Sequence, residues 1–278
     1  MANLIYDNFS DVFEFRRAIQ TRPDNGKLGH SARDNGNNFS GMSLDDAFNA
    51  LTDGLPEKAA ALNREINRFK AVVSGTVTQR RPINYYNGHS PNVPAAIIGL
   101  PKSMRKVTKT PSKVKTVTMF YNNTANCFVD AEDLEKAGAC VLQLVYWLEL
   151  NGYRVRLTLS PYLAQEHYGN KKSEHAVCNI LLKDYRQPLD LLKLSFSVTS
   201  VSMFRRLGFR WLETVPDLKG GGWRIGYGSQ IDDKDYALSL LEKCGQDVRN
   251  AYFIKVEDCD NAGWDALKLA ADLGIKVQ

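Results

Sequence analysis

The sequence predicts an α/β protein whose mostly parallel central sheet is flanked by helices and preceded by an N-terminal helical subdomain; an α+β arrangement is the alternative. Two observations support this class. From residue 113 onward, β-branched and aromatic runs alternate with apolar patterns of helical period, which is the order of a parallel sheet with crossover helices. Before residue 75, the clearest apolar patterns have helical spacing. The hydrophobic content of 44% in 278 residues is enough for a sizeable core.

The α/β domain is expected to span 113–278. Its first strand is the β-branched run 114–121, and its strongest helix begins after Asp130 and ends at Asn151-Gly152. Strands over 153–159 and 175–184 follow, joined by a polar connection over 161–173. The remaining expected elements are helices over 188–194, 198–207, 232–244 and 264–273, a Gly-rich loop over 218–230 and a strand over 251–256.

The N-terminal subdomain is expected over 1–75. Ser43 begins one helix that Gly54 ends, and a second helix follows Pro56 from Glu57 to Val73. Residues 23–41 are turn formers almost throughout, which predicts a mobile loop. A basic segment punctuated by proline and glycine, 76–112, connects the two parts. Its apolar run 93–100 is expected to be buried irregular backbone or an edge strand.

Targeting signals are not apparent. The chain has neither a signal-peptide pattern at Met1 nor an apolar run of membrane-spanning length. Its five cysteines are widely scattered without a Cys-x-x-Cys pair, which is typical of reduced thiols. We therefore expect a cytoplasmic protein without a membrane partner.

The positive charge of the chain is concentrated in one segment, residues 66–129. It holds ten of the 36 Lys and Arg residues and none of the 31 Asp and Glu residues, so the remainder has 26 against 31, a net charge of −5. A basic block beside an acidic remainder is typical of a polyanion-binding surface. The alternative is a solvated basic loop without a partner.

Aromatic residues accompany these cations. Tyr85 and Tyr86 follow Arg80-Arg81, and Arg205-Arg206 precede Trp211. Cations that track phosphates and aromatic rings that stack on unpaired bases favour single-stranded nucleic acid. The alternative for the rings is burial in the core. The residues predicted to bind nucleic acid are Arg80, Arg81, Tyr85, Tyr86, Lys102, Arg105, Lys106, Lys109, Lys113, Lys115, Arg205, Arg206 and, in the Gly-rich run 220–228, Trp223 and Arg224, for which a plain loop is the alternative.

Patterns for catalysis are weak. His167, His175 and Cys178 are close in sequence, but their spacings match no standard zinc pattern. Neither a Gly-x-Ser-x-Gly motif nor a recognisable Cys–His pairing is present. The acidic pairs lie at expected helix starts, where helix dipoles explain them. We therefore expect no metal, no cofactor and no enzymatic activity; a nuclease is the weakest of three hypotheses.

Two stretches carry a resemblance to known proteins. The run 43–57 and the segment Pro91-Asn-Val-Pro-Ala-Ala-Ile-Ile-Gly-Leu-Pro-Lys-Ser-Met104 resemble a family of phage proteins, whose α/β half, matched by 114–155, is similar to a von Willebrand A-type sheet. A metal site of that type needs Asp-x-Ser-x-Ser after the first strand, whereas Tyr121-Asn-Asn-Thr-Ala-Asn126 stands here. The absent aspartate argues against that metal site.

Size, basic segment and phage-like character together resemble the single-stranded-DNA-binding RNA polymerase cofactors (Drc type) of virulent tailed phages. This resemblance implies binding of locally melted promoter DNA, recruitment of a phage RNA polymerase and action in the cytoplasm of an infected bacterium. A role in replication stays open. The alternative hypothesis is a protein-interaction module with a von Willebrand A-like sheet, in which the basic segment meets an acidic host or phage partner.

Overall fold

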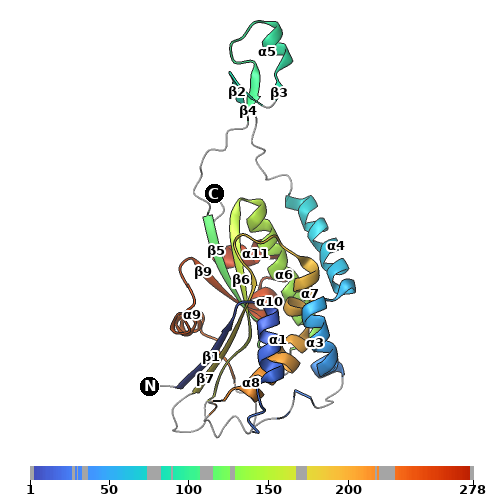
Figure 1. Cartoon of the computed structure of the whole chain (residues 1–278), viewed down its shortest axis with the longest axis vertical. Coiled ribbons are helices and arrows are strands. Elements are labelled where there is room, and N and C mark those ends of the chain that lie inside the picture. The colour runs from blue at the N-terminus through green and yellow to red at the C-terminus, as the bar shows by residue number, and fades with distance from the viewer. Residues whose placement is uncertain are drawn as a thin grey trace.

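The computed structural model of the chain describes residues 3–26, 29, 31–32, 37–73, 83–88, 90–106, 115–125, 129–166, 174–216, 218 and 229–275. These residues form a mixed α/β main body and a small module that Figure 1 shows apart from it. The predicted fold class is confirmed, because the central sheet is mostly parallel and is flanked by helices.

The central sheet runs in the order β1-β7-β6-β5-β9, with β8 pairing on β6. Its strands are β1 (Asn3–Phe9), β5 (Lys115–Asn122), β6 (Tyr153–Glu166), β7 (Glu174–Lys183), β8 (Ser229–Gln230) and β9 (Ala251–Lys255). The pairs β1/β7, β5/β6 and β5/β9 are parallel, whereas β6 pairs antiparallel with β7 and β8. β5 therefore lies between two parallel neighbours and forms the centre of the parallel part.

Side chains of the strands alternate between a larger and a smaller core. In β5, Met119 and Tyr121 point into the larger core, and Phe120 points into the smaller one. β6 has a bulge between Leu159 and Tyr162, so that both of these residues face the larger core although they are three positions apart. The bulge explains why the alternation of β6 changes phase while the strand stays buried.

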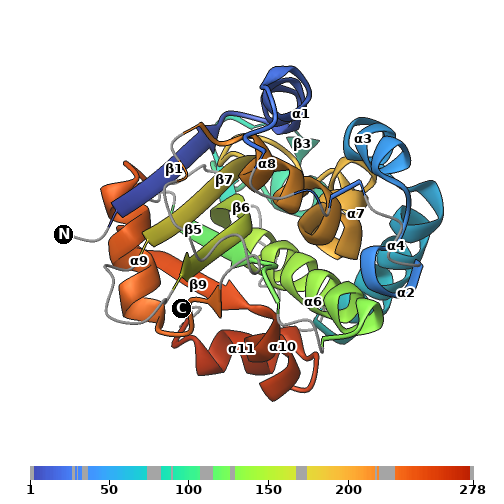
Figure 2. The same cartoon turned by 90° about the horizontal axis from the view of Figure 1, so that it is seen from below.

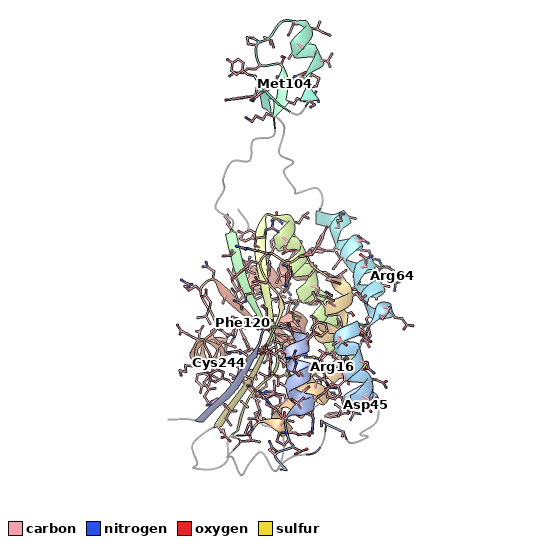
Figure 3. All side chains as sticks on the ribbon, viewed as in Figure 1. Arg16, Asp45, Arg64, Met104, Phe120 and Cys244 are labelled. Atoms are coloured by element: carbon pink, nitrogen blue, oxygen red, sulfur yellow. The ribbon has the colours of Figure 1, made fainter. Side chains whose placement is uncertain are left out.

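Helices cover both faces of the sheet, as Figure 2 shows. The smaller core lies under α9 (Lys234–Lys243), and Figure 3 shows Phe120 and Cys244 in this region. The larger core is shared by α1 (Val12–Thr21), α3 (Leu44–Asp53), α4 (Pro56–Val73), α6 (Ala131–Leu150), α7 (Leu191–Thr199), the π-helical turn η1 (Met203–Gly208), α8 (Phe209–Thr214), α10 (Val256–Asn261) and α11 (Ala266–Asp272). The short helix α2 (Asn37–Ser40) contacts η1.

The helix boundaries follow local chemistry. The Ser43 hydroxyl accepts a hydrogen bond from the Asp46 amide at the start of α3, and Gly54 ends this helix with a φ of 77°. In α6, Glu132 and Asp133 lie in the first turn, where the helix dipole favours acids. The predicted helices that became α3, α4, α6, α9 and α11, and the strands that became β5, β7 and β9, are confirmed within a few residues.

The expected division into an N-terminal helical subdomain and a separate α/β domain is wrong. Residues 3–9 form the edge strand β1, which pairs with β7 of the central sheet. Buried residues of α1, α3 and α4, such as Phe15, Phe48 and Leu62, join the same core as β5 and β6. The described residues between 3 and 73 and the later α/β part are therefore one packing unit.

The small module is residues 83–106, within the expected connecting segment. Its strands β2 (Ile83–Tyr85), β4 (Met104–Lys106) and β3 (Ser90–Pro91) form an antiparallel sheet in that order, with the helix α5 (Val93–Ile97). Figure 3 labels Met104 in this module. The expectation of buried irregular backbone or an edge strand over 93–100 is wrong, since the stretch begins with a helix and most of it is exposed.

Among the described helices, none combines the length and the apolar character that a membrane crossing requires.

Candidate nucleic-acid interface

Two adjacent tyrosines of the small module carry cations on their rings. Tyr85 and Tyr86 are 40% and 65% exposed, and their rings meet edge to face with centroids 5.8 Å apart. The Lys106 ammonium lies 4.7 Å from the Tyr85 ring centroid, and the Lys102 ammonium lies 5.6 Å from that of Tyr86. Both distances are within the range of a cation–π contact. The rings and the cations thus form one surface.

The strand register produces this arrangement. Tyr85 pairs with Met104 across β2 and β4, so Lys106, two residues further along β4, is the diagonal neighbour of Tyr85 on the same face. Arg105 lies between Met104 and Lys106 in β4 and pairs with Asn84. Its side chain points to the other face of the small sheet, where it is exposed. We call Tyr85, Tyr86, Lys102 and Lys106 the basic-aromatic surface, and Arg105 adds an exposed cation on the opposite face of the same small sheet.

The electrostatic field of this surface has one sign. Residues 83–106 contain no aspartate or glutamate. Within the described part of the chain, no carboxylate forms an ion pair with Lys102, Arg105 or Lys106. Lys115 is also exposed at the start of β5, with its ammonium 5.4 Å from the Tyr153 ring centroid. Unneutralised cations beside exposed aromatic rings suit an anionic ligand that has flat, unpaired bases.

The predicted binding role of Arg205 and Arg206 is corrected by their burial. They are only 3% and 4% exposed and lie in η1. Arg205 donates to the carbonyl oxygens of Phe39 (3.0 Å) and Val129 (2.8 Å). Arg206 donates to those of Met42 (2.9 Å) and Ser31 (2.8 Å). Both guanidinium groups hold distant backbone segments to the core from buried positions.

Trp211 is likewise a core residue, which agrees with burial in the core, the alternative to base stacking that the sequence left open for the aromatic rings. It is fully buried, and its indole N–H donates to the Asp7 carboxylate at 2.8 Å. The remaining residues predicted to bind nucleic acid lie outside the described residues and are Arg80, Arg81, Lys109, Lys113, Trp223 and Arg224.

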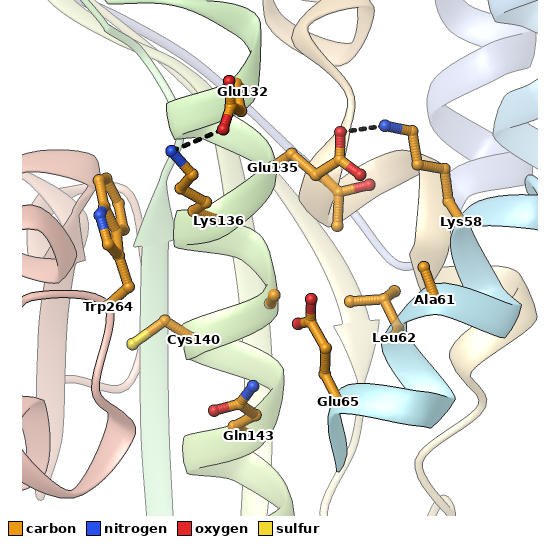
Figure 4. A pocket seen from close by; sticks show the side chains of 12 residues that line it. Lys58, Ala61, Leu62, Glu65, Glu132, Glu135, Lys136, Cys140, Gln143 and Trp264 are labelled. Atoms are coloured by element: carbon orange, nitrogen blue, oxygen red, sulfur yellow. Dashed lines mark hydrogen bonds and ion pairs between the residues drawn. The ribbon is translucent and has the colours of Figure 1, made fainter. Parts of the chain in front are cut away.

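A hollow of about 470 Å³ between α4 and α6 is a second place where charged side chains gather (Figure 4). Here Lys58 pairs with Glu135, and Lys136 lies 2.8 Å from Glu132. The hydrogen bond from Lys136 lowers the pKa of Glu132, and the same bond raises the pKa of Lys136. Glu65 faces these pairs from α4. The Lys58–Glu135 pair joins α4 to α6, whereas the Lys136–Glu132 pair lies within α6. The lowered pKa of Glu132 and the raised pKa of Lys136 make these two side chains a poor proton acceptor and a poor proton donor at neutral pH.

The end of β5 carries neutral side chains where a von Willebrand A-type metal site needs an aspartate. The Asn122 side-chain oxygen accepts from the Thr124 amide at 3.0 Å, and the Thr124 hydroxyl accepts from the Leu163 amide at 2.9 Å. These bonds hold the turn after β5 against β6. Throughout the described residues, no three His, Cys, Asp or Glu side chains gather in a metal-binding group.

His175 and Cys178, which are close in sequence, have other surroundings in the fold. His175 shares a 2.8 Å hydrogen bond with the Tyr236 hydroxyl, and His167 lies outside the described residues. Cys178 is fully buried, and burial raises the pKa of its thiol well above the usual value. Burial also raises the pKa of Cys244 to about 12. Since the thiolate is the reactive and ligating form, these two thiols are disfavoured as nucleophiles.

The residues that sequence reasoning missed are four exposed aliphatic side chains around α5. Val93 is 56% exposed, Ile97 78%, Ile98 71% and Leu100 48%. The sequence contained a signal for their exposure. Residues 92–101 carry no charge, and the segment around them is too short to form a core that buries their side chains. We call these four residues the apolar tip.

Comparison with known proteins adds a family and nothing on activity. The model of the family DUF7192, described as a domain of unknown function, matches residues 2–277. No curated protein and no solved structure matches the chain.

Proposed function

The chain belongs to the DUF7192 family, and we propose that it binds single-stranded nucleic acid, DNA in particular, through the basic-aromatic surface of the small module. The observation that carries the proposal is the pairing of exposed tyrosine rings with unneutralised cations: Lys106 at Tyr85 and Lys102 at Tyr86. Phosphates would contact the cations, and unpaired bases would stack on the rings. Double-stranded nucleic acid hides its base faces and satisfies only the first contact.

The segment around the module supports the same ligand. Ten cations and no acids lie between residues 66 and 129, so positive charge flanks the module on both sides in the sequence. Contacts to phosphates carry little sequence information, and we expect weak base specificity. If five or six phosphates are neutralised, the slope of log K against log salt concentration is about −4 for a single strand.

The test is fluorescence anisotropy with a labelled single strand of about 30 nucleotides, long enough for several binding registers, at a series of salt concentrations. The test variant replaces Lys102, Arg105 and Lys106 with alanine. Its slope should become shallower by about 2, because each phosphate contact contributes about 0.7.

The matched control replaces Lys193, Lys243 and Lys268, three exposed lysines of the main body, and changes the net charge equally. It should leave the slope within about 0.5 of the wild-type value. If both variants change the slope equally, the affinity depends only on the net charge of the protein, which would contradict a binding surface on the module. Absence of wild-type binding at low salt would contradict the proposal altogether.

We further propose a biological setting for this strand binding. In the setting that the resemblance to Drc-type cofactors implies, the protein would bind melted promoter DNA and bring a phage RNA polymerase to it. Transcription by the phage polymerase from a template with an unpaired promoter region should then depend on the protein and fall with the Lys102, Arg105 and Lys106 variant. Protein-independent transcription from that template would limit the function to strand binding.

A further inference from the structure

The apolar tip is a formed surface with a fixed backbone. α5 packs on the module through Ala95, which is 4% exposed, while Ile97 and Ile98 face solvent. The Leu100 amide donates to the Ala95 carbonyl at 2.9 Å, the Gly99 amide donates to that of Ala96 at 3.1 Å, and Gly99 has a φ of 72°. These are the two bonds of a Schellman motif, which closes the helix and holds Ile97 and Ile98 in place.

Exposure of this tip is costly unless a ligand covers it. Val93, Ile97, Ile98 and Leu100 are all about half exposed or more, within eight residues that carry no charge. Contiguous exposed aliphatic side chains of this kind mark binding surfaces. The proposed nucleic-acid contacts use the cations and the tyrosines and leave the tip without a function.

The tip adjoins the basic-aromatic surface. Lys102, whose ammonium lies over the Tyr86 ring, follows Leu100 by two residues. Arg105 and Lys106 follow in β4. A ligand that covers both regions must present apolar faces beside anionic groups. Base pairs at the end of an opened duplex do so, because their faces are uncovered between phosphates. Proteins are known to insert Ile, Leu and Pro side chains between base steps and to unstack them partly.

We infer that the apolar tip contacts base faces at a junction between single-stranded and duplex DNA, with Ile97 and Ile98 as the wedge. This inference rests on the proposed function and specifies its substrate class. The tyrosines hold the unpaired strand, the cations hold its phosphates, and the aliphatic side chains cover the last base pair. An anionic lipid surface or an apolar groove rimmed by carboxylates would satisfy the same charges, so both are included in the test.

The test compares three labelled DNAs, a single strand, a blunt duplex and a fork that joins the two, with 2-aminopurine in the first base pair of the fork. The wild-type protein should bind the fork about tenfold more tightly than the single strand and should raise the 2-aminopurine fluorescence as that base unstacks. The variant Ile97→Ser/Ile98→Ser should bind the single strand within about twofold of wild type and lose both fork effects.

The matched control is Phe13→Ser, which removes a side chain of similar exposure, 54%, from the main body. It should retain the fork preference and the fluorescence change. Ile97→Ala/Ile98→Ala provides a second variant with a smaller polarity change, and unfolding curves of all variants check that each is folded.

Five outcomes would overturn the inference. Wild-type binding to the single strand without fork preference would end the inference and leave the proposed function standing, whereas no binding to any DNA would end both. A serine variant that keeps the fork effects would remove Ile97 and Ile98 from the junction. The tip would be assigned to lipid if the wild-type protein binds phosphatidylglycerol vesicles and the serine variant loses this vesicle binding while it keeps its binding to the fork. A soluble peptide rich in carboxylates and apolar residues serves as a competitor. Fork binding of the wild-type protein that persists in its presence supports the DNA assignment. Loss of the fork effects when this peptide is the only competitor added would assign the tip to a protein partner.

Discussion

At the scale of single residues, Arg206 shows how a cation in a basic-aromatic sequence serves the core. Its guanidinium donates to the Ser31 and Met42 carbonyl oxygens from a position only 4% exposed. We expect Arg206→Ala to lower the free energy of unfolding by about 2–4 kcal/mol, because buried carbonyl oxygens lose their donor. Arg206→Lys should not restore it, since one ammonium cannot reproduce the planar fork.

Urea unfolding measures this loss, and anisotropy on the folded fraction provides the control. Single-strand affinity of the folded Arg206 variants should equal that of wild type. An affinity loss at unchanged stability would return Arg206 to the nucleic-acid surface.

Tyr86 can be used to distinguish stacking of its ring on a base from positioning of the Lys102 cation by that ring. Its ring is 65% exposed with Lys102 nearby. We expect Tyr86→Ala to weaken single-strand binding by about 1–3 kcal/mol, the range for one stacked base, whereas Tyr86→Phe keeps the ring and most of the affinity. The slope of log K against log salt should stay the same, because no phosphate contact is removed. A shallower slope in Tyr86→Ala would show that the ring acts by positioning Lys102.

At the scale of elements, the crossing of α6 and α7 depends on a residue without a side chain. A Cβ built at Gly138 in α6 would overlap the Val198 carbonyl of α7. Gly→Ala in a helix interior ordinarily stabilises by about 0.5–1 kcal/mol. Here we expect the opposite sign, a loss of about 1–3 kcal/mol from overpacking. Urea unfolding of Gly138→Ala measures it, and a gain in stability would mean that α7 shifts without cost.

The strand β1 illustrates what the sequence pattern concealed. Asp7 and Asn8 interrupt its apolar residues, and both residue types are unfavourable in strands. In the fold, Asp7 pairs with Arg22 at 2.5 Å and accepts from the Trp211 indole, and the Asn8 side chain donates to the Cys244 carbonyl at 2.6 Å. Partners from distant segments satisfy both polar groups, so local propensity could not predict the strand.

The stretch around α5 was misjudged for a different reason. Its apolar composition predicts burial, and a proline beside Val93 suits the first turn of a helix. Burial, however, requires enough surrounding chain, and the small module offers a three-stranded sheet of short strands. Helices such as α3 and α6, by contrast, were predictable because their periodic apolar residues lie within the helix itself, and Ser43 caps the start of α3.

At the scale of the whole molecule, the cations of the basic-aromatic surface lie on the small module, and the hydrophobic core lies in the main body. The acid-free segment 66–129 holds ten cations, while the rest of the chain has a net charge of −5. The charge sorting was visible in the sequence, and so were Tyr85, Tyr86 and Lys102 as candidates. The burial of Arg205 and Arg206 was not, because their partners are backbone carbonyls more than 70 residues away in sequence.

This division predicts that the binding surface and the stability of the main body can be changed separately. A Cβ at Gly88 would overlap the Arg105 carbonyl in β4, the central strand of the module. We expect Gly88→Ala to distort the register that aligns Lys106 with Tyr85 and to weaken single-strand binding about tenfold, as expected for loss of about one stacked base. The unfolding free energy of the main body should change by less than about 0.5 kcal/mol.

Gly138→Ala is the reciprocal control, because the same chemical change lies in the main body. It should lower the stability and leave the affinity of the folded protein unchanged. Urea unfolding and anisotropy on both variants give a two-by-two comparison. If Gly88→Ala lowers the unfolding free energy as much as Gly138→Ala does, the module and the main body unfold as one cooperative unit, and the affinity loss then follows from global stability. If only the affinity falls, the sheet of the module holds the binding residues in place while the main body keeps its own stability.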